Sequence, residues 1–384
     1  MLLFCKIKSM LKLSLMLSLI MLTLLSTLSC ATVGANADSH EANTVSTIPA
    51  YFPRFGREKP IIAVVGVNLY TELTDYVIPY GVMSESNVAQ VIALSTQEGE
   101  LKMMPALRIQ AQATVLEFDK KFPKGADYVF VPAVHNTEDP DLIGWIIAQS
   151  NKGATIIGVC DGVQVVANAG LLKQRKAVGH WYSFENLKEE FTDTEWVRNT
   201  RYIADKKVIT TTGVTASIPV SIALVEAIAG TDKANLVARS LGVDNWGVEH
   251  QSDQFNLKAK NIMTIASNWL RFWAKDKIGI PVNDGVDDIM LALTADAYSR
   301  TYRSTAYLMS QSKANVVSKR GLTFLSDITP RADDSVDRIV EIDNTVLPAY
   351  SLDVSLEQIR NIYGARTADI VTLTMEYPKK AHIR

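Results

Sequence analysis

A cysteine stands at the junction of a strand-like and a helix-like run in IIGVCDGVQVVANAGLL, residues 156–172. The spacing Gly158-x-Cys160-x-Gly162 is typical of a nucleophile elbow, in which the reactive side chain sits on a sharp turn between a strand and a helix. The two glycines leave room for the backbones to approach closely. Because a helix start presents free N–H groups and the positive end of the dipole, we expect a lowered thiol pKa. The alternative is a small buried cysteine that only fills packing space.

The N-terminal residues have the pattern of a targeting segment. Three lysines precede an apolar run at residues 13–29, and Ala35-Asn36-Ala37 resembles a cleavage signal, so we expect a signal peptide over residues 1–37. Lipidation at Cys30 and an uncut membrane anchor are the alternatives. All three place the rest of the chain outside the cytoplasm, in a periplasm or secreted. Cys160 is then expected to be the only free thiol, since the chain's two other cysteines lie within the first 30 residues.

From residue 59 onward, apolar runs alternate with helical patterns of about a dozen residues. The runs PIIAVVG, VAQVIALST, ATVLEF, ADYVFVPAV, ATIIGV and KVITTTG predict strands, whereas TELTDYVIPYGVMSES, DLIGWIIAQSN, DGVQVVANAGLL and SIPVSIALVEAIA predict helices. Such alternation predicts an α/β fold, a three-layer sandwich whose mostly parallel sheet is covered on both faces.

The pattern restarts after a helical stretch at residues 261–275. Residues 276–298 echo the run that begins at Pro60, with Asp288 opposite Asp75, and residues 351–371 align without gaps on residues 217–237. We therefore predict a linker at 38–58, a first domain at 59–248, a helical linker at 249–275 and a shortened second copy at 276–384 that lacks the elbow. Coincidental α/β patterning is the alternative.

The sequence around the elbow resembles a known family. Cys160, Gly162, the Ala-Gly-Leu-Leu run at 169–172 and His180-Trp181 match motifs of the ThiJ/PfpI superfamily, and TTTGVTASIPVSIALVE matches another. The resemblance is to the isonitrile-hydratase branch and to sensor domains fused to AraC-type regulators, without their helix-turn-helix region. It implies a flavodoxin-like, class I glutamine amidotransferase-like fold over residues 60–245.

The resemblance also implies roles for particular side chains. The family places an acid on the first helix beside the nucleophile, and that position falls on Asp75, as a proton-sharing partner of Cys160. A carboxyl beside a thiol titrates together with it. His180 matches a family histidine that lies near the cysteine in some members. The alternatives are an ordinary helix-start acid for Asp75 and a hydrogen-bonded structural histidine for His180.

Two positions depart from the family's pattern. Ala133 and Val134 stand where the family usually has two glycines whose N–H groups form an oxyanion hole, so close approach of a substrate is harder there. Asp161 follows the nucleophile, where this branch has threonine and the superfamily's proteases have histidine. We expect backbone donors around Ala133 and Asp161, with His135 as a candidate pocket residue or a solvated side chain.

The sequence suggests two functions. One is a cofactor-independent, cysteine-dependent enzyme that acts on a small electrophile in a hydrolytic, hydrating or glyoxalase-like reaction; the other is a non-enzymatic sensor of a ligand or of oxidative stress. No metal-ligand motif or phosphate-binding glycine pattern occurs, so we expect no metal or cofactor. A net charge of −2 gives no basic surplus for nucleic acid. We expect the second copy to pack on the first as an intrachain pseudo-dimer, with a homodimer as an alternative, and a membrane only through the N-terminus.

Overall fold

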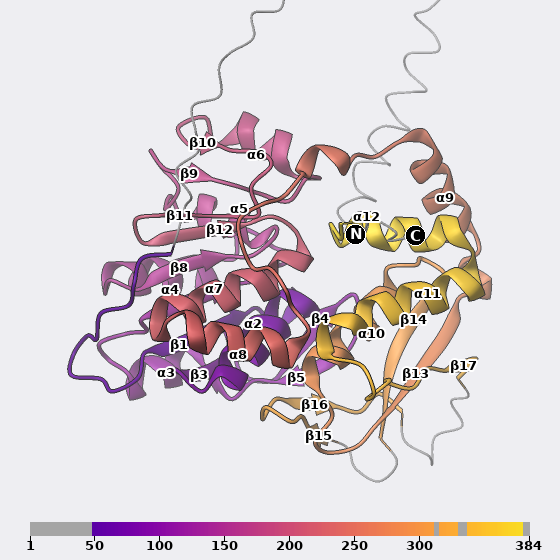
Figure 1. The fold of residues 1–384 in the computed structure, drawn as a ribbon, viewed down its shortest axis with the longest axis horizontal. Coiled ribbons are helices and arrows are strands. Elements are labelled where there is room, and N and C mark those ends of the chain that lie inside the picture. Colours follow the sequence, from indigo (N-terminus) through magenta and orange to yellow (C-terminus); the bar gives the residue numbers. More distant parts are fainter. Residues whose placement is uncertain (1–47, 311–314, 329–335, 379–384) are drawn as a thin grey trace, which may run out of the picture. The chain divides into compact units, whose positions relative to one another are not determined.

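The computed structural model describes residues 48–310, 315–328 and 336–378, which lie in one compact unit, residues 46–384 (Figure 1). The expected signal peptide, its cleavage motif and Cys30 lie outside the described residues. Among the helices of the described ranges, none is long and apolar enough to cross a bilayer. Residues 48–58, expected as a linker, contain no helix or strand, and their arginines bind the main domain: Arg54 donates to the Gly153 carbonyl and Arg57 pairs with Asp127 at 2.6 Å.

The largest sheet has seven strands in the order β11-β12-β8-β7-β1-β3-β6. Every neighbouring pair is parallel except β11 on β12. The strands are β1 (Ile61–Gly66), β3 (Gln90–Ser95), β6 (Ala113–Thr114), β7 (Tyr128–Val131), β8 (Thr155–Gly158), β11 (Tyr202–Asp205) and β12 (Val208–Thr211). The predicted α/β fold with a mostly parallel sheet is confirmed.

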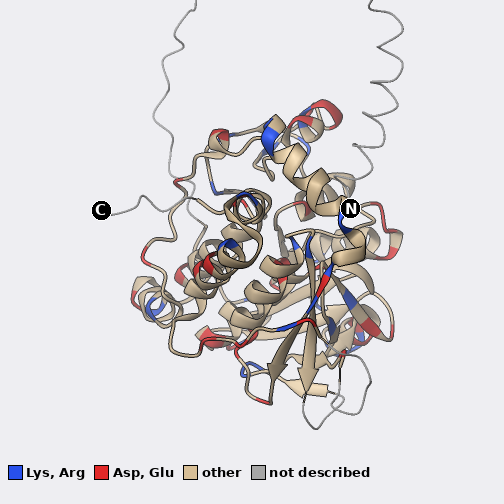
Figure 2. Cartoon of the chain, turned by 90° about the vertical axis from the view of Figure 1, so that its right-hand side faces the viewer, with Lys and Arg blue, Asp and Glu red and all other residues tan. Residues whose placement is uncertain are grey.

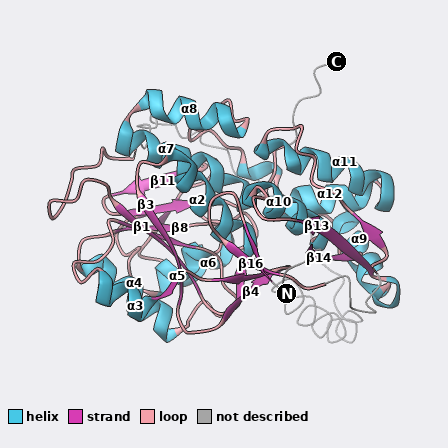
Figure 3. Ribbon diagram, turned by 90° about the horizontal axis from the view of Figure 1, so that it is seen from below, coloured by secondary structure: helices cyan, strands magenta, loops and turns pink. Residues whose placement is uncertain are grey.

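Helices cover both faces of this sheet because successive side chains of a strand point to opposite faces. In β1, Ile62 and Val64 join the core beneath α2 (Leu73–Ser86), α7 (Ser217–Ala229) and α8 (Thr231–Leu241). The alternate residues of β1 join a second core with α3 (Val115–Lys121), α4 (Pro140–Asn151) and α5 (Gly162–Asn168). Figure 3 shows the two helix layers on either side of the strands.

One predicted strand is wrong. ATVLEF contains only the two-residue strand β6, and Val115 begins helix α3. The reason is local: the Thr114 side chain accepts from the Glu117 N–H while the Glu117 carboxylate accepts from the Thr114 N–H. This reciprocal capping satisfies the free N–H groups of a helix start and outweighs the strand preference of the short apolar run.

The second half builds a smaller parallel sheet in the order β14-β13-β17. Its elements are α9 (Ala259–Leu270), β13 (Asp276–Val282), α10 (Asp288–Ser299), β14 (Ser304–Ser310), β17 (Arg338–Ile339), α11 (Ser351–Tyr363) and α12 (Ala365–Thr374). β13, α10 and β14 repeat the order of β1, α2 and β3. The helix pairs α7–α8 and α11–α12 both turn at a glycine of positive φ, +81° at Gly230 and +88° at Gly364. These correspondences support a shortened second copy, which stays a proposal.

The two halves of the chain are in direct contact through packed helices and through a joint sheet. α2 packs against both α7 and α10, and α10 packs against α11. A Cβ at Gly81 of α2 would lie 2.8 Å from Ile289 of α10, so the two helices approach too closely for a larger residue. A five-stranded sheet not predicted from the sequence, β15-β16-β5-β4-β2, draws strands from both halves. Its members are β2 (Leu69–Glu72), β4 (Glu100–Met104), β5 (Arg108–Gln110), β15 (Asn315–Val317) and β16 (Thr323–Leu325).

The remaining described α-helix and strands belong to the first domain. They are α6 (Phe184–Glu190) and the two-stranded sheet of β9 (Lys176–Ala177) and β10 (Glu195–Trp196). Basic and acidic side chains are interspersed over the chain in Figure 2. That arrangement fits the small net charge, and the expectation that the chain does not bind nucleic acid stays a prediction.

Candidate active site

The turn between β8 and α5 holds Cys160 in a left-handed backbone conformation, with φ +53°. This conformation is uncommon for a residue other than glycine and clusters at functional sites, where the surrounding structure enforces it. The flanking glycines explain how the turn fits. A Cβ at Gly162 would lie 2.1 Å from the Val131 carbonyl oxygen, and one at Gly158 would lie 3.1 Å from the Val163 Cα. The G-x-C-x-G spacing therefore corresponds to a sharp strand-to-helix turn packed against β7.

Cys160 is 6% exposed, and its N–H donates to the Thr211 hydroxyl at 3.2 Å. Burial raises the pKa of its thiol well above the usual range, and the carboxylates of Asp75, Asp161 and Glu72 add to this, while the Arg300 cation opposes it. The expected lowering of the thiol pKa by the helix start is wrong for this structure. α5 is only seven residues long, and desolvation together with neighbouring negative charge outweighs its dipole. Cys160 therefore rests as a neutral thiol.

Asp75 lies in the first turn of α2 and is fully buried. Its Oδ2 accepts a hydrogen bond from the Ala133 N–H at 3.1 Å, whereas its Oδ1 has no hydrogen-bond partner among the described residues. Burial raises the pKa of Asp75 well above its usual value, and the adjacent Glu72 carboxylate raises it further. The structure thus places a carboxyl with an increased proton affinity within electrostatic reach of the thiol, as a proton-transferring group requires.

The loop at Ala133 and Val134, which was expected to supply an oxyanion hole, has its backbone groups engaged in other hydrogen bonds. The Ala133 N–H is the donor to Asp75, and the Ala133 carbonyl accepts from the Glu72 N–H at 2.8 Å. Val134 forms a bridge with Thr71 of β2. The Ala133 donor is therefore not free to hold a developing oxyanion in this structure. His135 is exposed, and its ring lies edge-on to Tyr70 with centroids 6.0 Å apart, outside the buried group around Cys160.

The structure brings Asp161 and His180 to Cys160. One potential ligand atom from each of these three side chains lies within 4.8 Å of the others. His180 is 7% exposed, and neither ring nitrogen has a hydrogen-bond partner among the described residues; the same is true of Asp161 Oδ1. Thiolate, carboxylate and imidazole are the ligands that zinc takes in proteins, so the trio could hold such an ion. The same unpartnered atoms could equally contact a polar substrate.

A buried charge cluster beside Asp75 was not predicted from the sequence. Arg300, at the end of α10 in the second half, donates to Glu72 Oε1 at 2.5 Å and to Asp296 Oδ1 at 2.6 Å. The Thr74 hydroxyl contacts both carboxylates. Burial and the Asp296 charge raise the pKa of Glu72 to about 8, against the opposing effect of Arg300. No local motif marks these residues, because Glu72 and Arg300 are 228 positions apart in the chain.

A second contact from the second half of the chain is made by Glu376, which lies near His180. Glu376, which follows α12, is fully buried with φ +53°. Its Oε2 accepts from the Gly213 N–H at 2.7 Å and lies 3.9 Å from His180 Nε2, while its Oε1 lies 2.8 Å from His250 Nε2. The Trp181 indole donates to the Leu373 carbonyl at 3.0 Å. The C-terminal segment thus packs against His180 and Trp181, and the spacing of residues in the sequence did not predict this contact.

In the second half, the residue that aligns with Asp75 in the proposed repeat has a structural role. Asp288 is buried, pairs with Arg320 and accepts from the Ser318 hydroxyl at 2.8 Å. Arg320 also pairs with Glu85 and Asp287 at 2.9 Å each. The chain's single described cysteine lies in the first half. The groups suited to covalent chemistry therefore gather at Cys160.

Comparison with known proteins identifies a family match over part of the chain. Residues 62–227 match the DJ-1/PfpI family. Isonitrile hydratase from Pseudomonas putida is 30% identical over 104 residues, which is 27% of this chain and 44% of that protein. The HTH-type transcriptional regulator CdhR from Pseudomonas aeruginosa is 33% identical over 86 residues, 22% of this chain and 25% of the regulator. The chain thus matches less than half the length of these curated relatives.

Solved structures with a similar fold cover about half of the chain. The crystal structure of Drosophila melanogaster DJ-1beta aligns with a TM-score of 0.44 and 18% identity, covering 49% of this chain and all of that one. A ThiJ/PfpI family protein from Pseudomonas syringae aligns with a TM-score of 0.43 and 21% identity, covering 51% of this chain and 84% of that one.

Proposed function

The chain carries a DJ-1/PfpI family domain over residues 62–227, and from this premise we propose that it is a cysteine-dependent enzyme acting on a small electrophile. The observation that carries the proposal is Cys160 on its left-handed turn, buried within electrostatic reach of the Asp75 carboxyl, whose pKa burial raises. A neutral thiol and a carboxyl of raised pKa are suited to adding S–H across an electrophilic carbon. The partial likeness to isonitrile hydratase adds hydration to the candidate reactions.

The proposed hydration can be written for an isonitrile. The Cys160 sulfur bonds to the terminal carbon while that carbon gains a proton through Asp75, which gives a thioimidate. Water then adds to the same carbon, the carbon–sulfur bond breaks, and the sulfur regains a proton. The products are an N-substituted formamide and free Cys160, so the sum of the steps is addition of one water, and no oxidant or cofactor takes part.

The engaged Ala133 N–H favours this class of reaction over acyl transfer. Acyl transfer needs backbone donors aimed at an oxyanion from its first step, and the Ala133 donor already binds Asp75. Addition to an isonitrile places no negative oxygen in its first step. We propose His180 and Asp161 as groups that contact the substrate or the attacking water, since neither ring nitrogen of His180 nor Asp161 Oδ1 has a hydrogen-bond partner among the described residues.

The test is product formation by the full chain from a panel of small isonitriles and α-oxoaldehydes, followed by NMR. We expect one substrate class to be converted, with conversion lost in Cys160→Ser. The matched control is His135→Ala, which changes an exposed histidine outside the buried group and should convert at the wild-type rate. Conversion that survives in Cys160→Ser would refute the proposal.

The second candidate function is a non-enzymatic sensor outside the cytoplasm, which keeps the fold and the thiol. The observation that favours it is again the occupied Ala133 N–H, which removes a donor that turnover of many substrates requires. In an oxidation sensor, peroxide would convert the Cys160 thiol to a sulfenic acid with release of water. Selective sulfenic acid formation at Cys160, with no conversion of any substrate in the panel, would favour this alternative.

A further inference from the structure

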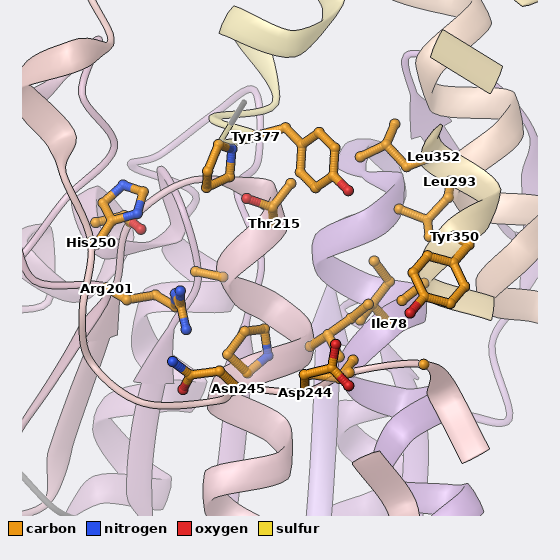
Figure 4. A pocket seen from close by; sticks show the side chains of 18 residues that line it. Ile78, Arg201, Thr215, Asp244, Asn245, His250, Leu293, Tyr350, Leu352 and Tyr377 are labelled. Carbon is orange, nitrogen blue, oxygen red and sulfur yellow. The ribbon is translucent and has the colours of Figure 1, made fainter. Parts of the chain in front are cut away.

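A cavity of about 630 Å³ lies where the two halves of the chain meet. Side chains from four helices line its apolar wall, among them Ile78 of α2, Ile218 of α7, Leu293 of α10 and Leu352 of α11. Figure 4 shows Ile78, Leu293, Leu352 and Tyr350 along one side of the space. The wall therefore includes helices from both the first domain and the second half.

The space opens at one end and is large compared with the gaps that close packing leaves between buried side chains. At ~30 Å³ for each water, this cavity has room for on the order of twenty molecules. Its volume falls in the range of about 300–1,000 Å³ that small-molecule sites occupy. Water against four large aliphatic side chains is poorly satisfied, so an apolar occupant would be stabilised there.

The polar end of the cavity carries a cation without a carboxylate partner. Arg201 lines the space, and Figure 4 shows its guanidinium directed into it near Asn245. Its one described side-chain hydrogen bond is from Nη1 to the Gly247 carbonyl at 2.7 Å, and no ion pair forms with a described residue. Burial lowers the pKa of Arg201, partly offset by the Glu249 charge. Asp244 and Asn245 also line the cavity and are exposed, which marks this end as its opening.

This cavity is separate from the Cys160 site. Neither Cys160 nor Asp75 lines it. His250 lines the cavity and bonds Glu376, whose other oxygen faces His180. The Glu376 carboxylate thus links the cavity to the Cys160 site, because it contacts His250 on the cavity wall and lies 3.9 Å from His180, which belongs to the Cys160 group.

We propose that this cavity binds a small monocarboxylate with an apolar body, with the carboxylate on Arg201 and the body against Ile78, Leu293 and their neighbours. Arginine matches the planar carboxylate with two parallel N–H donors. The free N–H groups of Arg201 supply this recognition, and the aliphatic wall accounts for the apolar body. The proposal goes beyond the function proposed for Cys160 and does not depend on it.

The test is calorimetric binding of octanoate and octanamide to the full chain. The two probes share an apolar body and differ in charge. A hydrogen bond to a charged group is worth about 1.5–3 kcal/mol, so we expect octanoate to bind roughly tenfold to a hundredfold more tightly than octanamide. In Arg201→Gln this preference should fall to about twofold or less, and Leu293→Phe, which fills the space from α10, should weaken both probes.

Two control variants define the outcome. Arg198→Gln makes the same change at an exposed arginine outside the cavity wall and should leave both affinities unchanged. Cys160→Ser should also retain binding, which separates this site from the proposed reaction centre. Melting temperatures will show whether each variant is folded. Equal affinity for the two probes in the wild type, no binding of either, or loss of octanoate binding in Cys160→Ser would each overturn the proposal.

Discussion

Replacing Glu72 by glutamine should make the protein less sensitive to alkaline pH. Glu72 is 4% exposed, and its pKa is raised from 4.5 to about 8 by burial and by the Asp296 charge. A carboxyl whose pKa is raised by folding stabilises the fold below its unfolded pKa, and that stabilisation is lost as pH rises through the folded value. In this protein the window of loss runs from about pH 4.5 to about pH 8.

The size of the effect follows from the shift. One pKa unit corresponds to 1.36 kcal/mol, so the shift of Glu72 from 4.5 to about 8 amounts to about 5 kcal/mol over the whole window. The slope approaches about 1.4 kcal/mol per pH unit in the middle of it. Glutamine carries no charge at any of these pH values and can still accept from the Asp75 N–H. The difference in unfolding free energy between Glu72→Gln and wild type should therefore move in favour of the variant by several kcal/mol from pH 4.5 to pH 8.

The assay is urea unfolding of both proteins at half-unit steps from pH 4.5 to pH 8.5 and constant ionic strength. Glu117→Gln is the matched control, because Glu117 also caps a helix start but is exposed, and its capping contacts lower its pKa. That control should run parallel to wild type above pH 5. If the Glu72→Gln curve also runs parallel to wild type over the whole window, Glu72 does not hold a proton in the folded state and the account of the buried cluster is refuted.

Three further predictions follow from the site. Gly162→Ala should lower the unfolding free energy by about 3 kcal/mol or more in urea titration, because its Cβ would overlap the Val131 carbonyl at 2.1 Å; an unchanged midpoint would contradict the elbow geometry. Arg300→Met should cost about 3–5 kcal/mol in the same assay, since it leaves the buried Asp296 carboxylate without its cation; a neutral or stabilising effect would count against that ion pairing. Asp161→Asn should speed alkylation of Cys160 by iodoacetamide at pH 7.5 by up to about tenfold, because loss of a negative charge lowers the raised thiol pKa; an equal or slower rate would show that Asp161 does not act on the thiol.

The elbow and the main sheet could be predicted because their signals are local. Alternating apolar runs identified β1, β7, β8 and β12 and the helices between them, and the glycines around Cys160 report a turn that lies within a few residues. The ATVLEF run failed for an equally local reason, since the capping box of Thr114 and Glu117 begins a helix there. Short apolar runs do not separate strand from helix by periodicity.

The electrostatics of the site could not be predicted in this way. The sequence suggested a thiolate because it shows the helix start but not the burial or the three carboxylates that raise the pKa of Cys160. Arg300 and Glu376 reach the site from the second half, and their contacts depend on how α10 and α12 pack on the first domain. Such long-range contacts leave no spacing signal in the sequence. The apparent repeat predicts that the two copies pack together, but it does not predict which side chains of one copy contact the other.

The most direct test of the account is to look for the covalent bond that it requires at Cys160. The full chain is mixed with an isonitrile, quenched in acid within the first turnovers and digested for mass spectrometry of the peptide that carries the elbow. We predict a mass increase equal to one isonitrile on Cys160, absent from Cys160→Ser and longer-lived in Asp75→Asn. Formamide produced without any adduct on Cys160, or produced equally by Cys160→Ser, would contradict the assignment of this cysteine as the nucleophile.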